Sequence, residues 1–155
     1  MTKTKLIRII SNVICLLAII ASIVVIILRY SQLPDRIPTN FDFSGNVTGY
    51  SSKGMLWALP VINLLIFVPI AAAELFPGSW NTGVNRRSRN YALSLRLSGI
   101  LLTIVKTASV LFISALTILV TISQGIPPWL TILFVLVLAG TMIWYFVRLA
   151  ASNRR

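Results

Sequence analysis

Four long apolar runs constrain the fold of this chain more than any other feature of its sequence. They are Ile9 to Leu28, Met55 to Ala73, Leu97 to Ile122 and Pro128 to Val147. Each is long enough, at roughly 20 residues or more, for a helix to cross about 30 Å of hydrocarbon. With 57% hydrophobic and 11% charged residues, a water-soluble domain is excluded. We expect one all-α integral membrane domain over residues 1–155, with four transmembrane helices.

The basic residues indicate the orientation of these spans. Of the 14 Lys and Arg, ten flank the predicted spans on one side: Lys3, Lys5, Arg8, Arg86, Arg87, Arg89, Arg96, Arg148, Arg154 and Arg155. The 29–54 loop on the other side has three. The positive-inside rule therefore predicts a membrane protein with both termini and the 74–96 loop in the cytoplasm, and the 29–54 loop outside. We therefore expect the basic residues behind the net charge of +11 to contact the headgroups of the lipid bilayer. We expect no nucleic acid partner.

Most catalytic and metal-binding side chains are absent from the sequence. It has no His, one Cys and three acidic residues, so a zinc site, a carboxylate dyad and a His-based triad are excluded. A Ser109–Lys106 pair on one helix would lack visible oxyanion donors. We therefore expect no enzyme, no cofactor and no metal.

Two predicted helices carry polar or small faces. Ser11, Cys15, Ala18 and Ser22 form a stripe on the first span, which we expect to pack against a neighbouring helix. The third span has a hydroxyl-rich face, made up of Arg96, Gly99, Thr103, Thr107, Ser114, Thr117 and Thr121. We expect these hydroxyls to bond to carbonyls of their own helix.

Lys106 lies at the edge of this face, about 14 Å inside the predicted cytoplasmic end. A charge at this depth must face protein or water and needs a partner. We predict a cluster of Lys106, Asn63 and the Leu65 carbonyl, which Pro69 frees, with Glu74 nearer the interface and better placed for Arg96. The cluster is either a tether that fixes helix register or a site for a ligand, an ion or a proton, in which Lys106, Asn63, Thr103 and Thr107 would take part.

The outer loop reads as a hairpin. Thr39 to Phe43 alternates polar and aromatic residues, Ser44 to Asn46 supplies a turn, and Val47 to Ser51 returns. The loop is either a plug that packs Ile37, Phe41, Phe43 and Tyr50 onto the helix ends, or a recognition surface. Arg36, Phe41 and Phe43 are its candidate binding residues.

The same loop resembles a known family. Leu33, Pro34, Ile37, Pro38, Phe41, Gly45, Ser52 and Lys53 match the pattern of the domain of unknown function at the N-terminal end of SdpI-type immunity proteins. The chain departs from that pattern at Asn40, Asp42, Thr48 and Ser51, so we carry over no metal or proton role of the family's His and Asp. The resemblance implies a bacterial plasma membrane protein, some of whose relatives protect the cell from a secreted peptide and signal its presence.

Two functions follow as hypotheses. The first is a protein that binds an extracytoplasmic peptide or toxin, or protects against it, through the outer loop. The second is a small transporter or channel subunit that uses Lys106 and the hydroxyl face of the third span. With four spans, such a subunit would form a homo-oligomer to enclose a path.

Overall fold

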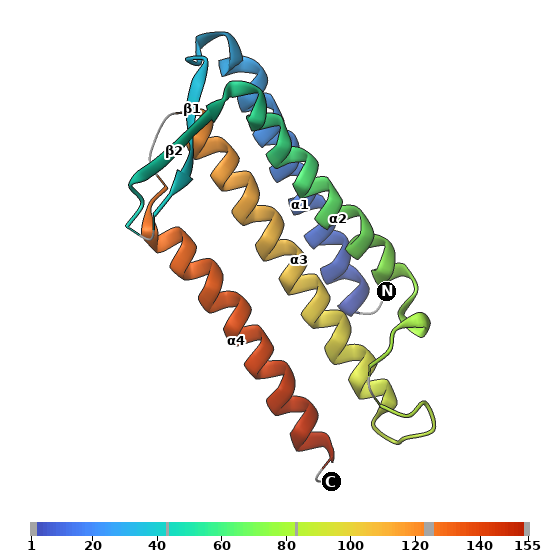
Figure 1. The fold of residues 1–155 in the computed structure, drawn as a ribbon. Helices are drawn as coiled ribbons and strands as arrows, with labels where there is room; N and C mark the ends of the chain where they lie inside the picture. The colour runs from blue at the N-terminus through green and yellow to red at the C-terminus, as the bar shows by residue number, and fades with distance from the viewer. Residues whose placement is uncertain (1–2, 43, 83, 123–125, 154–155) are drawn as a thin grey trace.

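The computed structural model describes residues 3–42, 44–82, 84–122 and 126–153, which form four long helices and a two-stranded sheet (Figure 1). The helices are α1 (Lys3–Arg29), α2 (Ala58–Leu75), α3 (Tyr91–Thr121) and α4 (Pro128–Asn153), and the strands are β1 (Arg36–Phe41) and β2 (Val47–Ser52). Short 3₁₀ turns cover Tyr30–Gln32, Lys53–Trp57 and Pro77–Ser79. The helices alternate in direction, so the α2–α3 connection and both termini lie at one end and the hairpin at the other.

All four predicted spans are confirmed as helices long and apolar enough to cross a membrane. These segments are Thr4–Gln32, Lys53–Leu75, Tyr91–Thr121 and Pro128–Ala151. The protein is therefore a multi-pass membrane protein. Helices α1, α3 and α4 are longer than the apolar runs; α3, for example, begins at Tyr91 instead of Leu97. Hydrophobicity marks the lipid-embedded part of a helix, whereas the helix itself continues through the polar interface.

Helix α3 is central to the bundle. It packs against α1, α2 and α4, whereas α4 makes its main helix contact with α3. The predicted packing stripe of α1 is confirmed, because Ser11, Cys15 and Ser22 are buried. Small side chains let helix backbones approach closely in lipid, where there is no hydrophobic force between helices. The helix interface therefore contains hydroxyl, amide and charged groups among its apolar contacts.

The predicted hairpin between the first two spans is confirmed as an antiparallel β1–β2 pair. Arg36 pairs with Ser52 and Pro38 with Tyr50, and the register becomes irregular around Asn40. On one face, Ile37 packs with Leu33, Ile26, Leu56 and Val120 in a small apolar core at this end of the bundle. This core fixes the hairpin on the ends of α1, α2 and α3.

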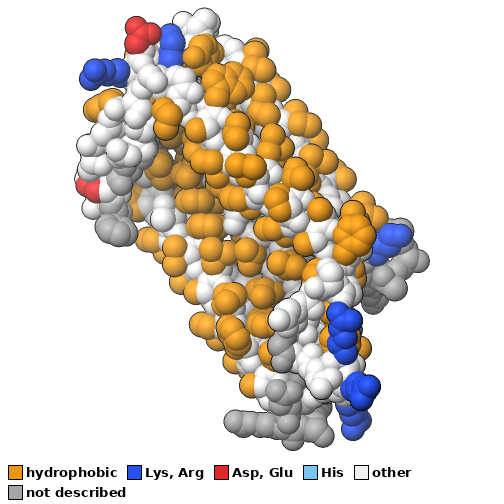
Figure 2. Space-filling view, turned by 45° about the vertical axis from the view of Figure 1, so that its right-hand side comes forward, with side chains coloured by type: hydrophobic (Ala, Val, Ile, Leu, Met, Phe, Trp, Pro, Cys, Tyr) orange, Lys and Arg blue, Asp and Glu red, His pale blue; other side chains and the backbone are white. Residues whose placement is uncertain are grey.

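The surface shows the pattern expected for a membrane protein. Figure 2 shows hydrophobic side chains over the middle of the molecule, with Lys and Arg at both ends and acidic side chains at one of them. Many large apolar side chains on α1 and α4 are exposed, among them Leu17, Ile27, Leu136 and Ile143. In a bilayer these side chains contact acyl chains instead of water.

Candidate functional site

A buried ion pair lies between the three tightly packed helices. The Nζ of Lys106 on α3 donates to Oε2 of Glu74 on α2 at 2.6 Å and to Oδ1 of Asn12 on α1 at 2.5 Å. The other carboxylate oxygen of Glu74, Oε1, accepts from the Thr103 hydroxyl at 2.7 Å. Lys106 is fully buried and Glu74 is 3% exposed. Each charge is therefore paired and hydrogen-bonded, which is the condition under which buried charges are tolerated.

This arrangement corrects the predicted partners of Lys106. The cluster of Lys106, Asn63 and the Leu65 carbonyl was a wrong prediction, as was the pairing of Glu74 with Arg96. The Nδ2 of Asn63 instead donates to the Ser114 hydroxyl at 2.9 Å and to the Val110 carbonyl at 3.2 Å. Ser114 lies eight residues beyond Lys106, or about 12 Å along the helix.

The error has a simple geometric cause. The prediction placed the end of the second span level with the start of the third, near Leu97. Helix α3 in fact begins at Tyr91, and the end of α2 meets it at Thr103. The first three turns of α3 therefore extend past the end of α2. Glu74 is thereby brought level with Lys106, and Asn63 moves further toward the hairpin.

The hydroxyls of α3 behave as predicted. Thr107, Thr117 and Thr121 each donate to the carbonyl four residues earlier. Because the Thr107 proton is used in this way, the Ser11 hydroxyl donates to Thr107 Oγ1, at 2.6 Å. Hydroxyls bonded to their own helix can still accept a bond from a neighbouring one, which joins α1 to α3 without burying an unpaired polar group.

The polar contacts continue to the predicted cytoplasmic end of α2. Arg8 donates to the Glu74 carbonyl at 3.0 Å and stacks over the Trp80 ring at 5.7 Å, while Trp80 Nε1 donates to the Ala73 carbonyl at 2.8 Å. These carbonyls belong to the last turn of α2, which has no helical donors for them. A cation at this point also complements the helix dipole.

Sequence reasoning missed two residues of this cluster, Asn12 and Arg8. Asn12 is the only amide within the run Ile9 to Leu28, and that signal could have identified it. Arg8 was interpreted only as a topological charge. Its role depends on the position of the α2 end, which hydrophobicity does not determine.

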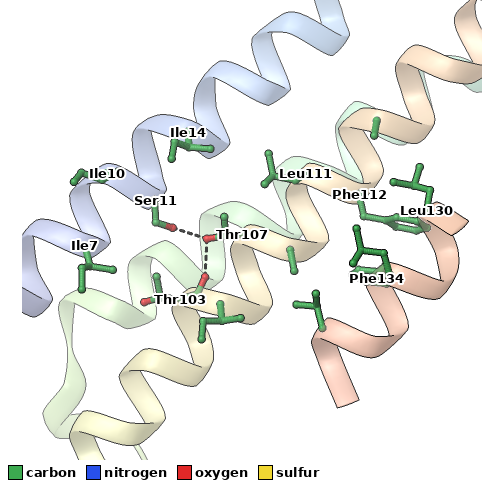
Figure 3. A pocket seen from close by; sticks show the side chains of 15 residues that line it. Ile7, Ile10, Ser11, Ile14, Thr103, Thr107, Leu111, Phe112, Leu130 and Phe134 are labelled. Atoms are coloured by element: carbon green, nitrogen blue, oxygen red, sulfur yellow. Dashed lines mark hydrogen bonds between the residues drawn. The ribbon is translucent and has the colours of Figure 1, made fainter. Parts of the chain in front are cut away.

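An open apolar groove lies beside the ion pair. It has a volume of about 690 Å³ and runs between α1, α3 and α4 (Figure 3). Ile7, Ile10 and Ile14 line it from α1, and Phe112 of α3 stacks on Phe134 of α4 with ring centroids 4.2 Å apart. Thr103 and Thr107 face this groove, but Lys106 is not among its lining residues.

The β1–β2 hairpin is the second candidate region. Lys53 forms an ion pair with Asp35 at 3.1 Å, its backbone N–H donates to the Asp35 carbonyl at 3.0 Å, and its Nζ lies 5.6 Å from the Tyr30 ring centroid. These contacts tie the end of β2 to the start of β1 and to the 3₁₀ turn that follows α1. Together with buried Leu33 and Ile37, they hold the hairpin in one position on the helix ends.

The turn of the hairpin is closed by Asp42. Its Oδ1 accepts from the backbone N–H of Ser44 and of Asn46, at 2.9 and 2.8 Å, and its Oδ2 accepts from the Asn46 side chain at 3.0 Å. The bonds from the Asn46 side chain and backbone hold the pKa of the Asp42 carboxyl below its ordinary value of 3.8. Gly45 has a φ of +84°, which favours glycine.

These residues include the positions of the loop that carry the family resemblance. Residues 16–64 match the family model described as domain of unknown function (DUF1648). These residues are therefore similar to the DUF1648 domain. This domain is found in SdpI-type proteins, so the resemblance predicted from the loop is confirmed. No curated protein and no solved structure matches the chain.

The DUF1648 match explains the loop pattern in structural terms. It covers the second half of α1, the hairpin and the first part of α2. Leu33 and Ile37 supply buried side chains, Gly45 supplies the turn and Lys53 supplies the ion pair. Asn12, Glu74 and Lys106 lie outside the matched residues. The match therefore concerns the hairpin end of the bundle and not the buried ion pair.

The predicted binding residues of the hairpin differ in how exposed they are and in whether the structure describes their side chains. Arg36 is exposed at the start of β1. Phe41 is the last residue of β1, but its side chain, like Phe43, lies outside what the structure describes. Tyr50, predicted to pack onto the helices in the plug interpretation, is 64% exposed, whereas Ile37 is buried as that interpretation expected. One face of the hairpin is thus an anchor and the other is free.

Proposed function

We propose that this protein lies in a bacterial plasma membrane with both termini in the cytoplasm, and that its outer hairpin binds an extracytoplasmic peptide. By holding this peptide it would protect the membrane, without catalysing a reaction. The observation that carries the proposal is the division of the hairpin into an anchored face around Ile37 and an exposed face around Tyr50. The occurrence of DUF1648 in SdpI-type proteins supports the same class of function.

Strand β2 is suited to bind an extended peptide. The sheet has two strands, and β1 contacts α3, whereas most residues of β2 are exposed. An exposed strand edge offers unpaired backbone groups to which a peptide can add as a further strand. Arg36 and Tyr50 would then contact side chains of the peptide.

A cavity of about 370 Å³ beside the hairpin turn adds a pocket to this surface. Asp42 and Gly45 line it from the hairpin, and Phe112, Leu116 and Ile132 line it from α3 and α4. Apolar pockets next to an exposed strand accept the anchor side chains that dominate the energy of peptide binding. We therefore expect an apolar or aromatic side chain of the bound peptide to enter here.

A transporter or channel role is less well supported. An ionisable group inside the membrane is a candidate for ion or proton movement. However, Lys106 is fully buried, and its partners Glu74 and Asn12 come from two other helices. These contacts are those of a tether that holds three helices in register. We assign Lys106 and Asn63 to the scaffold, and we propose no ligand contact for them.

The proposal is tested by survival of bacteria that do or do not express the protein, exposed to a panel of secreted antimicrobial peptides. Expression should raise the inhibitory concentration of at least one peptide. Arg36→Ala and Tyr50→Ala should abolish this gain while the amount of protein in the membrane stays constant. Arg29→Ala is the matched control, because Arg29 is exposed at the same end and bonds to Gln32 at 3.2 Å. Equal survival with and without the protein across the panel would refute the proposal.

A further inference from the structure

A second cavity lies at the opposite end of the bundle, between the start of α3 and the end of α4. It has a volume of about 560 Å³. Arg89, Arg96 and Arg148 line it together with Leu97, Ile100 and Trp144. Arg89 and Arg96 lie seven residues apart around the start of α3, and Arg148 comes from α4. The cavity therefore combines several positive charges with an apolar wall.

These arginines have no acidic partner in the described part of the chain. Glu74 is occupied by Lys106, and Asp35 and Asp42 belong to the hairpin at the other end. Neither a hydrogen bond nor an ion pair with a described residue involves Arg89, Arg96 or Arg148. Arginine side chains bind phosphate oxygens in a bidentate manner. The cavity is therefore complementary to an anionic group, most directly a phosphate.

The apolar groove between α1, α3 and α4 continues the cavity along the same helix faces. Ile100 lines the cavity, and Ile104, Ala108 and Leu111 line the groove at spacings of four, four and three residues. Such spacings keep side chains on one face of a helix. About ten residues of helix span the roughly 15 Å of one leaflet. A lipid acyl chain that starts beside Ile100 would therefore end near Leu111, inside the groove shown in Figure 3.

We propose that this cavity and groove form a specific site for an anionic phospholipid of the cytoplasmic leaflet. The phosphate contacts Arg96 and Arg148, with Arg89 beside it, and one acyl chain lies between α3 and α4. Trp144 occupies the interface, where its amphipathic ring is favoured. The site is independent of the peptide-binding function proposed for the hairpin.

Native mass spectrometry of the full-length, delipidated protein in detergent tests this site. The probes are dioleoyl phosphatidylglycerol and dioleoyl phosphatidylcholine. The first should form a one-lipid complex at a concentration about tenfold lower than the second, since near-surface basic residues attract anionic lipid. Arg96→Gln combined with Arg148→Gln should remove this preference. Arg86→Gln combined with Arg87→Gln removes the same charge outside the cavity and should leave the preference unchanged.

Two further experiments distinguish binding of a lipid from binding of a free anion. Ala108→Phe, which fills the groove, should weaken binding of dioleoyl phosphatidylglycerol but not of its dihexanoyl analogue. Excess inorganic phosphate should fail to displace the long-chain lipid. The proposal is overturned if the wild-type protein binds both headgroups equally, if both arginine pairs reduce the preference equally, or if inorganic phosphate displaces the lipid.

Discussion

The Nζ of Lys106 lies 2.6 Å from Oε2 of Glu74, and this contact joins α3 to α2 inside the membrane-spanning bundle. Asn12 on α1 completes the contact, so one ammonium group connects three helices. The hairpin that we propose as the binding surface rests on the far ends of the same helices. The ion pair therefore contributes, with other contacts between the helices, to the scaffold on which the hairpin rests.

Removal of one member of this pair should destabilise the protein more than removal of both. Lys106→Met leaves the Glu74 carboxylate buried without its cation, at an expected cost of about 3 kcal/mol in the free energy of unfolding. Glu74→Gln should have a similar cost, and the double variant should recover a large part of the loss. Denaturant-induced unfolding in detergent micelles measures all three. Additive losses in the double variant would mean that the two groups do not interact.

The register of α2 and α3 can be tested by crosslinking. In a Cys15→Ala background, Asn63→Cys combined with Ser114→Cys should form a disulfide rapidly on mild oxidation, because the two native side chains are 2.9 Å apart. Asn63→Cys combined with Lys106→Cys should not, since the two levels differ by about 12 Å. Gel mobility before and after reduction measures both pairs. Efficient crosslinking of the second pair would contradict the register.

Gly45→Ala should loosen the hairpin. The φ of +84° disfavours an L side chain by about 1–2 kcal/mol, and the added Cβ would lie 2.6 Å from the Ile126 carbonyl oxygen. Hydrogen exchange of the Asp42 and Gly45 amides should become faster. Gly54→Ala is the matched control, because the nearest atom to its Cβ, Ser52 Oγ, is 3.9 Å away. An equal response to both substitutions would show that the hairpin does not depend on Gly45.

The turn at Asp42 should depend on pH. Because its pKa is lower in the folded protein than the ordinary 3.8, the carboxylate stabilises the turn at pH values above 3.8. This contribution is lost as the pH falls through the lower, folded pKa. NMR titration of the Ser44 and Asn46 amide shifts should give a midpoint below 3.8 in the wild-type protein and no transition in Asp42→Asn. A midpoint at or above 3.8 would contradict the turn geometry.

The sequence predicted most of the fold because membrane insertion imposes strong local requirements. The four apolar runs, the small-residue stripe around Cys15 and the hairpin with its turn at Gly45 all depend on nearby residues. The back-bonded hydroxyls of Thr107 and Thr117 are also local, since the acceptor lies four residues away. These features needed no knowledge of how the helices meet.

The partners of Lys106 could not be predicted in the same way. Their identity depends on where α2 ends relative to α3, and α3 begins six residues before the predicted third span. Hydrophobicity locates a span in the membrane to within a turn or two, whereas a hydrogen bond requires a match within about 3 Å. An error of two turns was enough to replace Glu74 with Asn63. Asn12 was missed because its role requires α1, α2 and α3 to be placed together.

The central claim, that the hairpin binds the peptide and the ion pair supports the scaffold, is tested most directly by comparing two double variants in the survival assay. Lys106→Met with Glu74→Gln removes both buried charges, and Arg36→Ala with Tyr50→Ala changes the exposed face of the hairpin. At equal amounts of membrane protein, we predict that the first variant keeps wild-type protection and the second loses it. Loss of protection in the first variant with full protection in the second would contradict the account.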